Sequence, residues 1–124
     1  MWIPLNVNPS GKRVGDCVIR AIAVATGKPW TEVYDELYQV GRAEYSMMSA
    51  NDVWGLMLYR MGFEPFILPD SCPDCVTIRE FARHYPKGRY IVGTGEHAVA
   101  VVNGNYIDAW DSGNCTPAYF FKVS

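Results

Sequence analysis

Residues 15–27 of the chain read GDCVIRAIAVATG, and this stretch predicts a helix at the centre of the fold. Asp16 suits the start of a helix because its carboxylate can accept hydrogen bonds from the free N–H groups of the first turn. Gly27 suits the end, since glycine adopts a positive φ without steric cost. Nearly every side chain between them is apolar around the whole circumference, which is typical of a helix buried on all sides.

Cys17 lies in the first turn of this predicted helix. The unpaired N–H groups and the positive end of the helix dipole stabilise an anion there. A thiol in such a place has a lowered pKa, and its thiolate is the nucleophilic form. Cys17 is therefore a candidate nucleophile, and the alternative is that it serves only as a small buried apolar side chain.

Length and composition restrict the class of protein. The 124 residues suit one domain, 1–124, and a composition of 49% hydrophobic and 19% charged residues is typical of a globular chain. With a net charge of −2 and no basic cluster, we expect no nucleic-acid partner. No apolar run reaches the roughly 18 residues of a membrane span, and the first residues lack a secretion signal. We therefore expect a cytoplasmic protein without a membrane partner, whose reducing surroundings keep thiols free.

The order of the predicted elements indicates an α+β fold. Helical periodicity predicts further helices at 31–40, 49–61 and 77–84, the last two opened by capping boxes. Residues 1–14 and 63–68 are expected to be extended, and strands are expected at 89–93, 97–102, 105–110 and 118–123. Asn103-Gly104 between two of these strands is a strong hairpin signal. We thus expect helices packed on a small C-terminal antiparallel sheet.

A thiol nucleophile needs a base, and histidine performs this role near neutral pH. The chain has two histidines. His97 begins the most apolar predicted strand, directly after a turn at 93–96, so it lies at the rim of a rigid element. His84 ends a short helix and is expected to be a surface residue. His97 is therefore the candidate base.

The base needs an orienting partner, and two aspartates follow the predicted hairpin. With a two-residue turn at Asn103-Gly104, His97 lies opposite Trp110, and Asp108 shares its face as a diagonal neighbour. With a three-residue loop, Asp111 lies opposite His97 instead. The sequence does not fix the length of the loop, so both aspartates remain candidates.

The order of these motifs resembles the papain-like cysteine peptidase superfamily. HAVA at 97–100 is similar to its histidine strand, and NYI at 105–107 followed by DS at 111–112 is similar to its asparagine strand. This likeness favours Asp111 as the third catalytic group. More closely, GDCVIRA at 15–21 with YIDAWDS at 106–112 resembles small uncharacterised proteins of phages and gut bacteria, which look like compact C39-type members.

The resemblance implies a papain-like fold, with a cleft between the central helix and the sheet. It also implies a cysteine peptidase or related amidase with a Cys-His-Asp triad, a peptide or protein substrate and no cofactor, acting in the host cytoplasm if phage-encoded. Papain-like enzymes usually carry an oxyanion-binding glutamine about six residues before the cysteine, where this chain has Gly11. Asn8, or else Asn6, and the backbone N–H of Cys17 are the candidate replacements. The alternative function is a phage-encoded binding protein on this scaffold, with weak or no catalysis.

Arg20 lies one turn after Cys17 on the apolar helix, and we expect it to pair with an acidic residue of the core because a buried charge needs a partner. Cys72 and Cys75 have the spacing of half a zinc knuckle, but the other half is missing. We therefore interpret them as incidental thiols in a loop and expect no metal site. No oligomeric state is predicted.

Overall fold

The computed structural model describes residues 1–68 and 76–124, which form four helices and one six-stranded sheet. The helices are α1 (Cys17–Thr26), α2 (Trp30–Ala43), α3 (Asn51–Arg60) and α4 (Ile78–His84). The strands are β1 (Trp2–Pro4), β2 (Glu64–Ile67), β3 (Arg89–Gly93), β4 (Ala98–Val102), β5 (Asn105–Asp108) and β6 (Tyr119–Lys122). The predicted α+β class is confirmed.

The sheet is mixed, with the strand order β1-β5-β4-β3-β6-β2. All neighbouring strands are antiparallel except β1 and β5, which are parallel and pair Trp2 with Tyr106. The expectation of a purely antiparallel sheet is therefore wrong, because the N-terminal segment joins it as an edge strand. Pro4 fits this edge because proline has no N–H to donate to a second neighbour.

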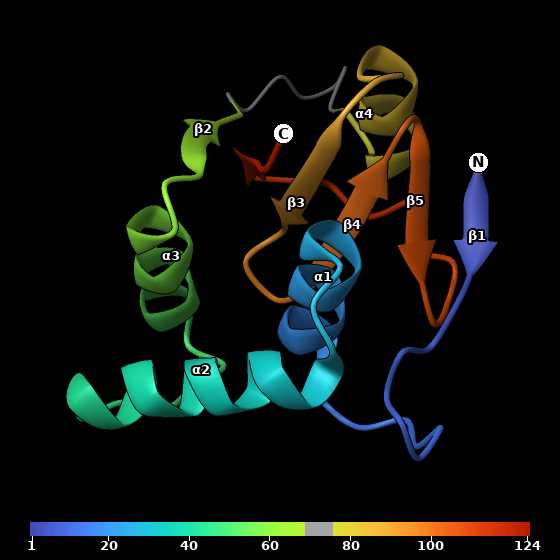
Figure 1. The fold of residues 1–124 in the computed structure, drawn as a ribbon. Helices are drawn as coiled ribbons and strands as arrows, with labels where there is room; N and C mark the ends of the chain where they lie inside the picture. Colours follow the sequence, from blue (N-terminus) through green and yellow to red (C-terminus); the bar gives the residue numbers. More distant parts are fainter. Residues whose placement is uncertain (69–75) are drawn as a thin grey trace.

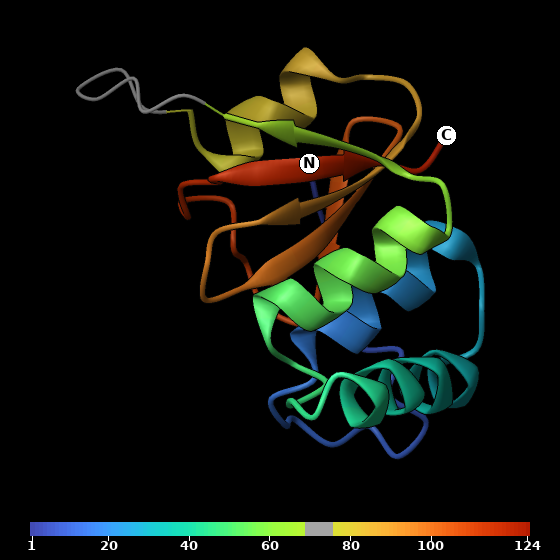
Figure 2. The ribbon, with the colours of Figure 1, turned by 90° about the vertical axis from the view of Figure 1, so that its left-hand side faces the viewer.

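Helices cover both faces of the sheet (Figures 1 and 2). On one face α1, α2 and α3 bury a core that includes Ala98 and Ala100 of β4, whose small side chains let α1 lie close to the strand. On the other face α4 buries Phe81 against Val99 and Val101. The site described below lies at the edge of the first of these cores.

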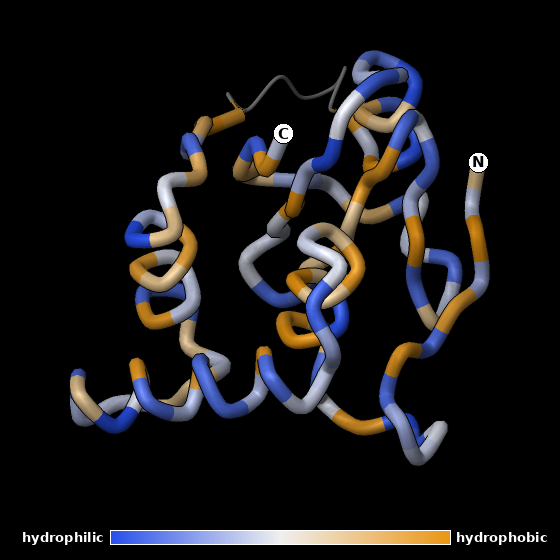
Figure 3. The backbone as a smooth tube through the Cα atoms, in the orientation of Figure 1, coloured by the Kyte–Doolittle hydropathy of each residue, from blue (hydrophilic) through white to orange (hydrophobic). Residues whose placement is uncertain are grey.

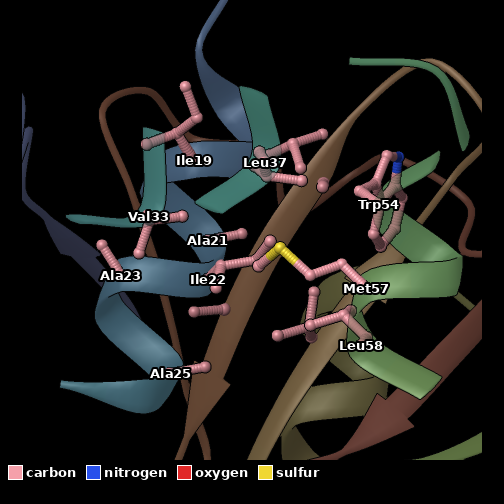
Figure 4. Close-up of a cluster of buried hydrophobic side chains, with 14 of the residues drawn as sticks. Ile19, Ala21, Ile22, Ala23, Ala25, Val33, Leu37, Trp54, Met57 and Leu58 are labelled. Carbon is pink, nitrogen blue, oxygen red and sulfur yellow. The ribbon is translucent and has the colours of Figure 1, made fainter. Parts of the chain in front are cut away.

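The central helix α1 is buried as predicted. Its fully buried Ile22 points toward Met57 of α3 (Figure 4). Gly27, with φ of 77°, follows the helix and donates its N–H to the carbonyl of Ala23. At the other end the prediction is wrong in one respect, because Asp16 precedes the helix but makes no capping hydrogen bond with its side chain. Its carboxylate binds other donors, described below.

The other helices begin and end near the predicted residues. The hydrophobic positions of α2 turn toward α1 and α3, where Val33 and Leu37 are fully buried (Figure 3). The predicted helix cap at Thr77 is confirmed, since its side chain accepts a hydrogen bond from the N–H of Glu80, while the Glu80 carboxylate binds the Thr77 hydroxyl at 3.4 Å. The capping box predicted at 49–52 is wrong, because α3 follows Ala50 without a side-chain cap. No helix among the described residues is long and apolar enough to cross a bilayer.

The β4–β5 hairpin turns through two residues. Asn103 and Gly104 have φ of 48° and 81°, the two positive values that a tight hairpin turn of this kind requires. Val102 therefore pairs with Asn105, and Ala100 pairs with Ile107. Continuing this register by three residues places His97 opposite Trp110, and their ring centroids are 4.7 Å apart.

Candidate active site

Cys17 is the first residue of α1, and its side chain is partly exposed. Because Asp16 does not cap the helix, no capping side chain covers the amide groups of this first turn. These groups and the helix dipole favour an anion beside the sulfur. The thiol is thus accessible and lies where a thiolate is stabilised.

The thiol interacts with His97, which the turn between β3 and β4 presents. The backbone N–H of His97 donates to Oγ1 of Thr94 at 3.0 Å, and the N–H of Thr94 donates to the carbonyl of His97 at 2.9 Å. Burial alone raises the pKa of the Cys17 thiol, but hydrogen bonds with the His97 side chain and the Ala98 backbone hold it below its usual value. The sequence-predicted nucleophile and base therefore lie together.

Asp108 binds the other side of the imidazole. Its Oδ2 lies 2.6 Å from Nε2 of His97 and accepts the hydroxyl of Ser112 at 2.7 Å. Its Oδ1 accepts from Nη1 of Arg20 at 2.7 Å and from the N–H of Ala109 at 2.8 Å. Two donors on each oxygen fix the rotation of the carboxylate. Since a carboxylate only accepts, Nε2 carries a proton, and Nδ1 is the ring nitrogen that can exchange a proton with the thiol.

These contacts separate the pKa values of the three groups. Burial lowers the pKa of His97, but its hydrogen bonds with Asp108 and Cys17 raise it to about 9. Burial raises the pKa of Asp108, but hydrogen bonds from His97, Ser112 and Arg20 hold it below its usual value. Together with the lowered pKa of the thiol, these directions favour a thiolate beside an imidazolium at neutral pH.

Asp111, the aspartate that the resemblance favoured, lies elsewhere. Its Oδ1 accepts from the hydroxyl of Tyr106 at 2.6 Å and from the N–H of Gly113 at 3.0 Å, and lies 3.7 Å from Nη2 of Arg79. Among the described residues no hydrogen bond joins it to the imidazole. The two-residue turn of the hairpin is the reason, because in this register Asp108 is the carboxylate on the side of the histidine.

Arg20 is buried and joins two acidic residues, as the sequence predicted. Its Nε donates to Oδ1 of Asp16 at 2.8 Å, while its Nη1 binds Asp108. The second oxygen of Asp16 accepts from Nε1 of Trp30 at 3.0 Å and from Nδ2 of Asn8 at 3.2 Å. One buried chain of hydrogen bonds therefore runs from Asn8 through both carboxylates to the imidazole.

The side-chain amides of Asn8 and Asn6, proposed as oxyanion donors, donate hydrogen bonds to other groups. Nδ2 of Asn8 donates to Asp16, as just described. Nδ2 of Asn6 donates to the carbonyls of Gly11 and Lys12 at 3.3 and 3.1 Å. The position of Asn8 in the chain suggested an amide near the thiol, but its side chain supports the carboxylate network instead.

Cys17 and His97 open into one groove of about 350 Å³. Its walls are the start of α1, the start of α3 (residues 49–51 and Trp54) and residues 95–97 of the β3–β4 turn, which lies beside α3 in Figure 2. Nδ2 of Asn51 ties these last two walls together by donating to the carbonyl of Gly95 at 2.9 Å. A substrate placed in this groove would meet the sulfur and the imidazole side by side.

Asn51, which lines the groove, was missed at the level of sequence. Oδ1 of Asn51 accepts from Nε1 of Trp54 at 3.1 Å and from the hydroxyl of Tyr119 at 3.3 Å. Burial and the nearby Cys17 sulfur raise the pKa of Tyr119 to about 12. The only sequence signal was a polar residue at a helix start beside a core tryptophan, which is too common to identify a site.

No family model, curated protein or solved structure matches this chain.

The chemistry of the site therefore has to be inferred from its geometry. Within residues 1–68 and 76–124 no cluster of three histidine, cysteine or acidic side chains could hold a metal ion. The half zinc knuckle at Cys72 and Cys75 lies outside the described residues. What the described groups can do together is transfer a proton from a thiol to an imidazole that a buried carboxylate orients.

Proposed function

We propose that the chain is a cysteine peptidase, or a related thiol acyl hydrolase, built on a papain-like arrangement of central helix and sheet. The observation that supports this most is the juxtaposition of Cys17, His97 and Asp108 at one groove, with the pKa of the thiol lowered and that of the imidazole raised. The order of these residues in the chain is also that of the superfamily it resembles. The substrate would be a peptide or protein that the groove can hold.

In the proposed reaction the Cys17 thiolate attacks the carbonyl carbon of the substrate. The carbonyl oxygen gains the charge, and the free backbone N–H of Cys17 at the helix start is a donor for it. The His97 imidazolium then protonates the leaving amine, which leaves a thioester on the sulfur. Next the neutral imidazole takes a proton from water, whose oxygen attacks the thioester and releases the acid and the thiolate. Asp108 stays ionised throughout and keeps the imidazole oriented.

Alkylation with iodoacetamide, followed by peptide mapping, tests the proposal on the full chain. Cys115 is an internal control, because burial and the nearby Asp108 charge raise the pKa of its thiol. We expect Cys17 to react at least about tenfold faster than Cys115 at pH 6, since only the thiolate is a nucleophile. His97→Ala should remove this advantage without changing the rate at Cys115. Equal rates in the wild-type protein would contradict the proposal.

A binding protein on the same scaffold is the second candidate, and one observation favours it. The Asn8 amide that was to replace the oxyanion-binding glutamine donates to Asp16, so a side-chain donor for the oxyanion is missing at that place. Loss of one such donor costs on the order of a hundredfold in rate. A reactive Cys17 that hydrolyses no member of a fluorogenic peptide library would support this second candidate.

A further inference from the structure

We propose that Arg20 is a positioning residue for the catalytic pair, because it holds the carboxylate of Asp108 against His97 from the same helix that carries Cys17. This inference rests on the proposed function and extends it to a residue that touches neither the sulfur nor the imidazole through a hydrogen bond. It assigns to the guanidinium a role in catalysis besides its contribution to the fold.

The geometry of the two ion pairs carries the inference. Nη1 of Arg20 lies 2.7 Å from Oδ1 of Asp108, and Nε lies 2.8 Å from Oδ1 of Asp16. All three side chains are at most 10% exposed. A planar guanidinium held at two nitrogens has a fixed orientation, which a single ammonium would not have. The carboxylate of Asp108 is therefore held by a rigid cation.

The position of Arg20 on α1 links the Asp108 carboxylate to the helix that carries Cys17. Arg20 and Cys17 are three residues apart on α1, so they lie on neighbouring positions of one helix face. The sulfur and the cation that holds Asp108 thus belong to one rigid element. His97 is bound at Nε2 by that same carboxylate. The distance from sulfur to imidazole is in this way fixed through Arg20 and Asp108 as well as through the sheet.

The second carboxylate keeps Arg20 from turning away. The other oxygen of Asp16 accepts hydrogen bonds from Trp30 of α2 and from Asn8 of the N-terminal segment. Asp16 is 5% exposed, and within the described part of the chain every hydrogen bond to its carboxylate comes from Arg20 or from these two donors. Arg20, Trp30 and Asn8 do not line the groove, and the need to fix Arg20 accounts for these contacts.

The charges around the sulfur agree with this role. The charged or titratable groups near the sulfur include His97 and Glu96 of the β3–β4 turn, which line the same groove, Arg20 of α1 and Tyr119 of β6. After burial and the hydrogen bonds, the positive charges of His97 and Arg20 help to lower the pKa of Cys17. Removal of Arg20 should therefore weaken the thiolate as well as release the carboxylate.

The pH dependence of Cys17 alkylation tests the inference on the full chain. In Arg20→Met, we expect the acid limb of the rate profile to move up by about one pH unit, which is about tenfold in rate at pH 6. Val33→Ala is the control for lost stability, because it shortens a fully buried side chain of α2 away from the groove. Lys28→Met is the control for a lost ion pair, since Lys28 pairs with Glu36 at 3.0 Å. Both controls should keep the wild-type profile.

The outcomes separate the inference from the proposed function. A wild-type profile in Arg20→Met, or the same shift in Val33→Ala, would overturn the positioning role while leaving a reactive Cys17 intact. An unreactive wild-type Cys17 would instead overturn the proposed function. If Arg20→Met does not fold, Arg20→Lys is the variant that tests the inference. It keeps the positive charge but lacks the planar guanidinium with its two donor nitrogens. Its alkylation rate at pH 6 should fall several-fold, and an unchanged rate would overturn the inference.

Discussion

Two aspartates three residues apart have very different surroundings. Asp108 is 2% exposed and holds Arg20 and His97 within 2.7 Å. The side chain of Asp111 is 45% exposed, and the cation that pairs with it, Arg79, lies 3.7 Å away. The Asp108 carboxylate accepts four hydrogen bonds and that of Asp111 accepts two. The larger difference is burial, because water screens charges at the surface and hardly reaches a pair in the interior.

The two carboxylates therefore have different tasks. Asp108 fixes the charge and orientation of an imidazole. Asp111 fixes the loop after β5, where it holds the Tyr106 hydroxyl and the N–H of Gly113. That loop is tightly packed, since a Cβ on Gly113 would overlap the same hydroxyl.

The largest effect is expected for Asp108→Asn. The amide cannot neutralise Arg20 and His97 as a carboxylate does, and breaking a buried ion pair costs about 3 kcal/mol or more. The free energy of unfolding, measured by urea denaturation, should fall by about this amount. The alkylation rate of Cys17 at pH 6 should also fall, because the pKa of His97 loses the hydrogen bond that raises it most.

Asp111→Asn is the matched control for that variant. Its side chain can still accept from the Tyr106 hydroxyl, and solvent surrounds it, so the loss of stability should be clearly smaller. The Cys17 alkylation rate should not change. An equal effect of the two substitutions on that rate would contradict the contrast between the carboxylates.

A smaller effect is expected in the pH dependence of stability. In the wild-type protein the proton lost by Cys17 is held by His97. The lowered pKa of the thiol and the raised pKa of the imidazole therefore have opposite effects on the pH dependence of stability. In Cys17→Ser the contribution of the sulfur to the His97 pKa is lost, but the hydrogen bond with Asp108 still raises that pKa. The folded state then keeps a proton that an unfolded histidine loses above its ordinary pKa of 6.5, so stability is full below that value and falls as the pH rises. We expect an unfolding free energy lower by about 1 kcal/mol at pH 8.5 than at pH 6.

The double variant Cys17→Ser, His97→Asn provides the control for this measurement. Without the imidazole the decrease between the two pH values should disappear. If the unfolding free energy of the double variant decreased by the same amount, other titratable groups would be its cause. That result would contradict the charged state inferred for His97.

The smallest effect is expected at the surface. Arg79→Met removes the cation that pairs with Asp111 and also donates to Asn114 at 2.6 Å. Because exposed ion pairs contribute little, the melting temperature should change by about 2 °C or less. A decrease as large as that of Asp108→Asn would show that the surface cluster matters to the fold as much as the buried one.

The sequence predicted those parts of the molecule that local patterns determine. The α+β class, the limits of α1 and the tight hairpin at Asn103-Gly104 follow from apolar periodicity and from glycine at positions of positive φ. It also predicted that Arg20 would pair with buried acidic residues. Each of these depends on neighbours in the chain or on the rule that buried charges are paired.

Contacts between distant segments were harder to predict. The choice between Asp108 and Asp111 depended on one residue of loop length, which the sequence left open. Asp16 has the pattern of a helix cap, but its carboxylate binds the buried guanidinium one turn later in place of the amide groups. Ser112 donates to Asp108 from a loop whose path no periodicity describes.

The edge strand β1 has a consequence for how the protein acquires its site. Trp2 pairs with Tyr106, and the carbonyl of Asp108 accepts from the Trp2 indole at 3.1 Å and from the N–H of Leu5 at 3.0 Å. During synthesis, residues 2–4 therefore have no strand to pair with until a strand about a hundred residues later has been made. In a nascent chain Cys17 would be exposed and would lack His97 and Asp108 until the β4–β5 hairpin had been made. Only then could its thiol become reactive.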